Sequence, residues 1–404
     1  MSSNPVGAGP RSTAALPLAV FFAVTVEMAP AGALSHIATA LHTDIGSVAA
    51  GSSLYALSTA LLALPLAGLA QRFDLRKATI IAGIAFTILG LAAAAGPDLT
   101  GYLAFRALNG AAHAAFFPLV LALAAAAAPR NTAQAVARVL LGNGLALALG
   151  VPAAEALAAL DWRLPLALGS VGVATAISFA PRPTPQERPI AEEAVDGSPG
   201  RIVWLAALFA IALAGHFAYY TFLAPSAETS SLPASLVLGI YGAAVIAATA
   251  ISGAIAKRNR LGRAVAVIAI ESILLAVTAI IPGPVTTIIA TVIAGACFGF
   301  LPTLIQTEML HRAPGNQTLV SGAAVVAFNT GIAAGSAAGA AFAGHSTIFP
   351  SLLGAVLLIT SGIGFAVLRA VGRSRWMHSK GGRVTTARAC LPPQADSQTH
   401  NALR

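Results

Sequence analysis

The sequence predicts an all-α integral membrane protein with twelve transmembrane helices arranged in two six-helix halves. Three observations support this fold class. Charged residues make up 9% of the 404-residue chain and apolar residues 57%, whereas about 25% of the residues in soluble domains are charged. Long apolar runs recur from residue 14 to residue 370. These runs fall into two sets of six on either side of one polar segment, so a membrane is the solvent that fits the chain.

Each predicted span contains about 20 mostly apolar residues, the length at which a helix crosses a hydrocarbon layer about 30 Å thick. The first set is expected at 14–38, 47–70, 77–95, 99–128, 134–158 and 162–180. The second set is expected at 201–225, 235–256, 262–281, 284–310, 318–343 and 348–370.

Polar stretches divide the chain further. Residues 1–13 form a short segment before the first span. The stretch "PRPTPQERPIAEEAVDGSPGR" is rich in proline and charge, so residues 181–200 are predicted to be a linker between the halves at 14–180 and 201–370. The polar and basic tail, 371–404, is expected to be disordered.

Basic residues indicate how the spans are oriented. All but two of the 23 Lys and Arg residues lie on one side of the predicted membrane; the exceptions are Arg106 within the fourth span and Arg163 on the opposite side. By the positive-inside rule the basic side is the cytoplasm, so both termini and the linker are expected there. The formal net charge of +9 then faces an anionic inner leaflet, so membrane lipids account for it and no nucleic-acid partner is needed.

The two halves also contain similar motifs. The stretch "GLAQRFDLRK" matches "GAIAKRNRLGR", "NGAAHAAFFPL" matches "AGACFGFLPTL", and "GNGLALALG" resembles "FNTGIAAGSAAG", each at a spacing of about 185 residues. Chance similarity between Ala-rich helices would not place Asn, Pro and loop cations in register. The pattern predicts a duplicated six-helix unit whose halves rock about a central site.

Several of these motifs resemble those of a known family. "VEMAPAGALSHIATALH", "RALNGAAHAAFF" and "LGNGLALALGVPAAEALAALDWR" are similar to motifs of the major facilitator superfamily, specifically its twelve-helix drug:proton antiporters of the arabinose-efflux-permease-like kind. The resemblance covers about residues 14–370. It implies the major facilitator fold and a monomeric transporter of a bacterial inner membrane. Such a transporter exports a small, amphipathic, drug-like compound in exchange for protons by alternating access.

One loop departs from the family pattern. After the second span the family usually has an acid before its first arginine and a glycine after it, but here Gln71 and Asp74 stand at those places around Arg72. The resemblance gives this loop a role in the conformational change, and Asp74 is the residue that could substitute for the acid.

Glu27 and Arg106 are the expected proton-coupling residues. A charged side chain at bilayer depth should face the interior and have a partner. At about 1.5 Å per residue, Arg106 and Glu27 lie close enough in depth to interact across a central cavity. Burial favours a neutral carboxyl group and a nearby guanidinium favours the carboxylate, so a change in wetting would let Glu27 bind and release a proton. The alternative is a static ion pair or carbonyl clamp.

Further polar residues are candidates for substrate binding. His113 follows Arg106 by seven residues on nearly the same helix face, where it could contact substrate, relay a proton, or bond one helix to another. Asn143 and Asn329 occupy matching places in the repeat and could line the cavity or serve packing.

His216, Tyr219 and Tyr220 in the seventh span could stack on or hydrogen-bond an organic substrate, although tyrosines often anchor a span at the interface. The acids Glu155, Glu271 and Glu308 are secondary proton candidates, with Glu271 expected at the periphery.

Gly150 and Pro152 predict a bend in the fifth span. Glycine allows close helix packing, and proline removes a helical hydrogen bond. The resemblance of "GVPAA" to the antiporter motif favours a role of this bend in the conformational change, although static packing would select the same residues.

The chain contains no phosphate-binding G-x-x-x-x-G-K-[ST] loop, no H-E-x-x-H zinc motif and no G-x-S-x-G elbow, so no cofactor, metal or enzymatic activity is expected. The expected partners are a small-molecule substrate, protons and lipids. Two other functions stay open at this point. One is a permease for efflux or uptake of a sugar or nucleoside, and the other is a membrane sensor or scaffold that does not transport.

Overall fold

The structure is a computed structural model that describes residues 10–70, 72–128, 132–182, 199–256, 259–312, 317–343 and 348–388. The described residues contain helices and no strands, which confirms the predicted all-α class. Eleven segments of this part are long and apolar enough to cross a membrane, and the apolar helix at Arg163–Ser178 is shorter. This arrangement is consistent with twelve spans.

The first half of the chain forms seven α-helices and one short π-helix. They are α1 (Pro10–Ala40), α2 (Ile45–Ala70), α3 (Leu75–Ala94), α4 (Leu99–Ala127), α5 (Thr132–Leu145), the π-helix η2 (Ala146–Gly150), α6 (Val151–Ala158) and α7 (Arg163–Ser178). Together α5, η2 and α6 make up the fifth predicted span, and α7 is the sixth.

The second half forms seven α-helices. They are α8 (Pro199–Tyr220), α9 (Leu223–Thr229), α10 (Ala234–Ile255), α11 (Arg260–Ile280), α12 (Pro284–Arg312), α13 (Gln317–Ala343) and α14 (Ile348–Arg388). The short α9 completes the seventh predicted span. Most of the predicted linker lies outside the described residues.

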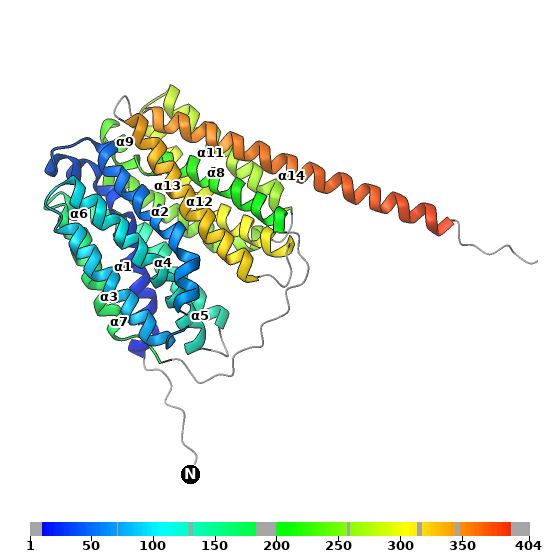
Figure 1. Cartoon of the computed structure of the whole chain (residues 1–404). Coiled ribbons are helices and arrows are strands. Elements are labelled where there is room, and N and C mark those ends of the chain that lie inside the picture. The colour runs from blue at the N-terminus through cyan, green and yellow to red at the C-terminus, as the bar shows by residue number, and fades with distance from the viewer. Residues whose placement is uncertain are drawn as a thin grey trace, which may run out of the picture.

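The last helix runs beyond residue 370, where the twelfth span was expected to end. α14 continues to Arg388 and extends away from the other helices (Figure 1). No proline occurs between Pro350 and Pro392, so no residue of this stretch lacks a backbone hydrogen-bond donor. Residues 389–404 lie outside the described part.

Short polar residues cap several helices at the loops. Asp74 Oδ1 accepts a hydrogen bond from the Lys77 amide at 2.9 Å, and Asp98 Oδ1 accepts one from the Gly101 amide at 2.8 Å. Asp44 does the same for α2, with the Ser47 hydroxyl and amide as donors. These bonds stabilise the carboxylate, so the pKa of Asp44 lies below its ordinary value, chiefly because of the Ser47 hydroxyl.

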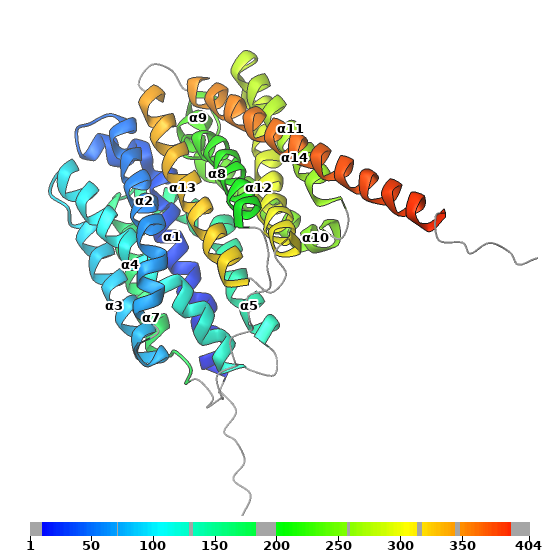
Figure 2. The same ribbon diagram turned by 45° about the vertical axis from the view of Figure 1, so that its right-hand side comes forward.

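The helices form two groups that lie side by side (Figures 1 and 2). Between the groups, α2 packs against α13, and α10 packs against η2 and α6. We call the end of the molecule at which α1 ends and α2 begins the α1–α2 end. There the Ser35 hydroxyl of α1 donates to Glu228 Oε2 of α9 at 3.0 Å. The two groups are therefore in contact at the α1–α2 end.

Candidate functional site

Arg106 lies on α4 with no solvent exposure. Its Nη1 donates to the Val26 carbonyl at 3.1 Å and its Nη2 donates to the Glu27 carbonyl at 2.9 Å. The Tyr55 ring lies under the guanidinium, 4.4 Å from Cζ to the ring centroid. Pro30 explains why α1 offers an acceptor here, because proline has no N–H for the carbonyl four residues earlier, that of Val26.

The Glu27 carboxylate lies next to a histidine. Its Oε2 is 3.8 Å from His113 Nε2, and the two side chains are 10% and 8% exposed. The sequence predicted Arg106 as the partner of Glu27, whereas in the structure the arginine bonds to the main chain of α1. The reason is that Pro30 leaves the Val26 carbonyl without its helical donor. An analysis that pairs only charged side chains does not consider such a main-chain acceptor. The guanidinium thus binds two carbonyl groups of α1, and the role of Glu27 and Arg106 in proton coupling stays a prediction.

His113 is held among aromatic rings. It stacks on Phe117 with a centroid distance of 5.5 Å and lies 5.6 Å from Tyr55 and 5.9 Å from Phe86. Its Nδ1 and the Tyr55 hydroxyl are buried polar atoms without a hydrogen-bond partner in the described part of the protein. Tyr55 was missed by the sequence analysis, because a single tyrosine in an apolar span does not reveal which helix face it occupies.

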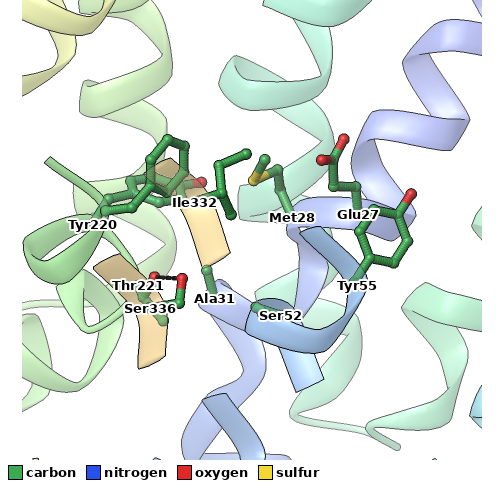
Figure 3. A pocket seen from close by; sticks show the side chains of 10 residues that line it. Glu27, Met28, Ala31, Ser52, Tyr55, Tyr220, Thr221, Ile332 and Ser336 are labelled. Atoms are coloured by element: carbon green, nitrogen blue, oxygen red, sulfur yellow. Dashed lines mark hydrogen bonds between the residues drawn. The ribbon is translucent and has the colours of Figure 1, made fainter. Parts of the chain in front are cut away.

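A pocket lies between the two groups of helices, next to Glu27 (Figure 3). About 290 Å³ of space among its lining residues is not filled by protein atoms, a figure that includes open solvent. Glu27 and Tyr55 line it from the first half of the chain, and Tyr220 lines it from the second half. The remaining lining residues are Met28, Ala31, Ser52, Phe217, Thr221, Ile332 and Ser336.

The pocket is mostly apolar, with few polar groups. Figure 3 shows Thr221 and Ser336 side by side, and their hydroxyl oxygens are 2.8 Å apart. Ser52 adds a third hydroxyl on the side of α2. Glu27 is the only ionisable carboxyl group among the residues that line this pocket. Such a lining suits a compact organic molecule with an apolar body and several hydrogen-bonding groups.

The substrate candidates of α8 are divided between two places. Tyr220 lines the pocket, whereas Tyr219 and His216 do not. His216 Nδ1 lies 2.5 Å from Glu271 Oε1, and its Nε2 lies 2.8 Å from the Tyr241 hydroxyl. Glu271, predicted to be peripheral, is 1% exposed. Helix rotation decides which residues meet, and neither this pairing nor Tyr241 had a signal in the sequence.

The two asparagines do not line the pocket. Asn329 Nδ2 donates to the Val325 carbonyl of its own helix at 3.1 Å, and Asn143 is half-buried on α5. Arg72 is exposed in the loop after α2, and Asp74 caps α3 through the Lys77 amide. Asp74 therefore contacts the start of its own helix.

The fifth span has an irregular backbone where the sequence predicted a bend. Residues 146–150 form the π-helix η2, and the Val151 amide donates to the Ala146 carbonyl. Pro152 follows at the start of α6 and cannot donate to the preceding turn. A Cβ at Gly150 would overlap Thr25 Oγ1 of α1, so glycine is needed for this close approach.

Membrane-length helices in two groups, with a pocket lined from both, define a membrane transport protein. Residues 16–336 match the family model of the Major Facilitator Superfamily. The chain belongs to this superfamily of transporters, which confirms the family resemblance of the sequence motifs.

Similar proteins include a chloramphenicol efflux pump and a chloramphenicol resistance protein. A chloramphenicol efflux pump of Mycobacterium tuberculosis is 28% identical over 218 residues, which are 52% of this chain and 52% of the pump; the chain thus matches about half the length of that relative. A chloramphenicol resistance protein of Streptomyces lividans is 28% identical over 82% of this chain and 89% of its own. The inner membrane transport protein YdhP of Escherichia coli is 29% identical over 85% of this chain and 92% of its own length.

Solved structures share the fold. A bacterial homologue of the human lysosomal transporter Spinster, in an inward-facing and unoccupied conformation, matches with a TM-score of 0.68 and 15% identity over 89% of this chain and 96% of its own. A mutant of the nucleoside transporter NupG matches with a TM-score of 0.69 and 13% identity, over 88% of this chain and 99% of its own. At these identities the likeness concerns the fold alone.

Proposed function

We propose that this protein exports a small, amphipathic, drug-like compound of the chloramphenicol type in exchange for protons, by alternating access. The observation that carries the proposal is the position of Glu27, a largely buried acid in the wall of the pocket between the two halves. The names of the similar proteins support the substrate class, since two of them are a chloramphenicol efflux pump and a chloramphenicol resistance protein.

Glu27 is the proposed proton carrier. In the dry pocket its carboxyl group is neutral, because an uncompensated buried carboxylate is costly. When water reaches the pocket from the cytoplasm, the ionised form is solvated and the proton leaves. His113, 3.8 Å from the carboxylate, is positioned to accept a hydrogen bond from the neutral acid. A hydrogen-bond donor of the substrate that binds the ionised carboxylate competes with the proton for this group, so uptake of a proton releases the substrate and the two are exchanged.

Arg106 is a positioning residue in this scheme. Its two hydrogen bonds fix the main chain of α1 at Val26 and Glu27, and its permanent charge stabilises the carboxylate once the proton has left. The guanidinium therefore holds Glu27 in position and favours release of its proton. The other substrate contacts come from Tyr220, Phe217 and the Thr221–Ser336 hydroxyl pair.

The proposed location is a bacterial inner membrane, with both termini in the cytoplasm and the α1–α2 end outside. The distribution of Lys and Arg supports this orientation. Two six-helix halves, 14–180 and 201–370, move relative to one another, and Arg72, Asp74, Gly150 and Pro152 act in that movement. We expect a monomer, because the pocket is formed within one chain.

Proteoliposomes with an imposed pH gradient test the proposal. In the wild-type protein, chloramphenicol should move against its concentration gradient, and protons should move across the membrane in the opposite direction. Glu27→Gln should abolish both movements. Glu155→Gln is the matched control, since Glu155 is a half-buried acid on α6 that does not line the pocket. Proton-coupled chloramphenicol transport with an unchanged pH profile in Glu27→Gln would refute this role.

A metabolite permease is the second candidate function. The observation that favours it is the group of three hydroxyls in the pocket, from Ser52, Thr221 and Ser336, because hydroxyls recognise the hydroxyl groups of a sugar or nucleoside. Including nucleosides and sugars in the same assay separates the two substrate classes. Ligand binding without flux of any compound would instead favour a membrane sensor or scaffold.

A further inference from the structure

A second buried ionisable pair lies in the other half of the protein. His216 of α8 and Glu271 of α11 are each 1% exposed, and His216 Nδ1 lies 2.5 Å from Glu271 Oε1. On the other side of the ring, Nε2 lies 2.8 Å from the hydroxyl of Tyr241 on α10. Three helices thus place a carboxyl group, an imidazole and a phenol in one line of hydrogen bonds, and the proposed exchange through Glu27 does not use them.

Among the residues that the structure describes, no permanent cation accompanies Glu271. On α11, Arg260 bonds to Glu308 and Arg263 bonds to the Ile255 carbonyl, both at the far end of the helix. Helix α13 and residues 348–368 of α14 contain no titratable residue. The remaining ionisable groups that face the pair are Tyr219 and Tyr220 of α8, Tyr241 of α10 and Cys297 of α12.

Charge balance therefore requires a proton on the pair. An uncompensated buried carboxylate is costly, and among the described residues only a proton shared with His216 can neutralise Glu271. Water that reaches the pair can instead solvate a carboxylate and accept the proton, so the wetted pair no longer needs to keep it.

The pair also lies directly behind the wall of the pocket. The ring of Tyr220, which lines the pocket opposite Glu27, stacks on His216 with centroids 6.2 Å apart and lies 4.6 Å from Tyr241. Phe217 lines the same pocket and contacts His216 edge-on at 5.4 Å. The Tyr220 hydroxyl is buried and has no hydrogen-bond partner among the described residues. Movement of this wall, by substrate or by opening of the halves, would change the wetting of the pair.

We propose that the Glu271–His216 pair is a second proton-carrying site, in the C-terminal half, that holds one proton when dry and releases it when water reaches it from the cytoplasmic side. The proton enters from water outside when the site is open there, resides between Oε1 and Nδ1 while the site is closed, and leaves to cytoplasmic water. Tyr241 positions His216 by bonding to Nε2. The inference rests on the proton coupling proposed above and adds a second proton to each cycle.

Infrared difference spectroscopy between pH 5 and pH 9, on protein in lipid nanodiscs, tests the site without any substrate. Wild-type protein should show a pH-dependent carboxyl or imidazolium band that both Glu271→Gln and His216→Gln abolish. Glu155→Gln should keep that band. A static hydrogen bond predicts instead that neither Glu271→Gln nor His216→Gln removes a titrating band, and this result would overturn the proposal.

Tyr241→Phe keeps the ring and removes only the hydroxyl, so it serves if the two other variants do not fold. Its band should remain but titrate at a different pH, since Nε2 has lost its partner. An unchanged midpoint in Tyr241→Phe would contradict the proposed link between Nε2 and the pair.

Transport stoichiometry gives an independent test. With the membrane potential clamped at zero, each coupled proton raises the limiting chloramphenicol gradient about tenfold per pH unit. Glu271→Gln should therefore lower that limit about tenfold per pH unit while transport continues, and Glu27→Gln should abolish transport. If the limiting chloramphenicol gradient is the same in Glu271→Gln and in wild type, the second proton site is refuted and the proposed function is not. Absence of chloramphenicol flux in wild type overturns the proposed function instead, and the infrared result then decides the second site.

Discussion

Arg106 occupies the most deeply buried charged position of the first half, and its contacts account for its presence there. A guanidinium at bilayer depth costs at least about 2.5–3.5 kcal/mol. Its hydrogen bonds to the Val26 and Glu27 carbonyls each contribute about 1.5–3 kcal/mol. The Tyr55 ring adds a desolvated cation–π contact of about 2 kcal/mol. These contributions offset the cost, so the residue needs no direct ion pair with Glu27.

Replacing Arg106 with lysine tests the two-carbonyl geometry. An ammonium keeps the charge, but it lacks the planar fork that reaches both carbonyls while stacking on Tyr55. Arg106→Lys should therefore cost about 1–3 kcal/mol of stability, measured as a lower melting temperature of the purified protein in detergent. Arg163→Lys is the control, because Arg163 is exposed; equal melting temperatures for the two variants would contradict the clamp.

At the scale of single elements, two prolines set the local geometry of the spans beside the pocket. Pro30 leaves the Val26 carbonyl of α1 without its helical donor, and Arg106 fills that place. Pro152 follows the π-helix η2, where α1 comes so close that Gly150 has no room for a side chain. Irregular backbone in a membrane helix is tolerated where neighbouring groups satisfy or cover it, and here each irregularity faces another span.

A double-mutant cycle measures the link between Pro30 and Arg106. In Pro30→Ala the restored amide can bond to the Val26 carbonyl, so this acceptor no longer depends on the guanidinium. Arg106→Met should consequently be less destabilising in the Pro30→Ala background than in wild type, by about 1 kcal/mol. Melting temperatures of the four proteins give the coupling. Additive effects would show that the two residues act independently.

A second cycle tests the contact between α1 and η2. Gly150→Ala places a methyl group against the Thr25 side chain, so overpacking should cost about 1–3 kcal/mol. Thr25→Ala removes the hydroxyl and methyl that the new Cβ meets, and it should restore part of the stability of Gly150→Ala. Thermal unfolding of the single and double variants provides the measurement, and the same loss with and without Thr25→Ala would exclude this contact as the cause.

For the molecule as a whole, the sequence predicted the positions of the spans better than their contacts. Every predicted span contains a helix, and the irregularity at Gly150 and Pro152 lies where the motif placed it. The pairing of His216 with Glu271 could not be predicted, because it depends on how α8 and α11 are rotated about their axes. Likewise, the binding of Arg106 to main-chain oxygens requires the depth and angle of α4 against α1, which no spacing rule fixes.

The two halves meet closely at the α1–α2 end. The Ser35 hydroxyl bonds to Glu228 Oε2 at 3.0 Å, and a Cβ at Gly46 of α2 would lie 2.6 Å from the Ala340 carbonyl of α13. These contacts join the two halves at this end of the molecule. In the proposed cycle of alternating access they must separate before protons and substrate can pass at this end.

Crosslinking the α1–α2 end tests this requirement. In a background without Cys297 and Cys390, Ser35→Cys with Glu228→Cys should react with a short bifunctional thiol reagent, because the native side chains are in hydrogen-bond contact. The crosslinked transporter should bind chloramphenicol in the cytoplasm-facing state but lose net transport, and reduction of a cleavable crosslink should restore it. Each single-cysteine variant treated with the same reagent controls for modification without crosslinking. Because alternating access requires both ends to open in turn, an unchanged transport rate after complete crosslinking would mean that substrate follows a route other than the pocket between the halves.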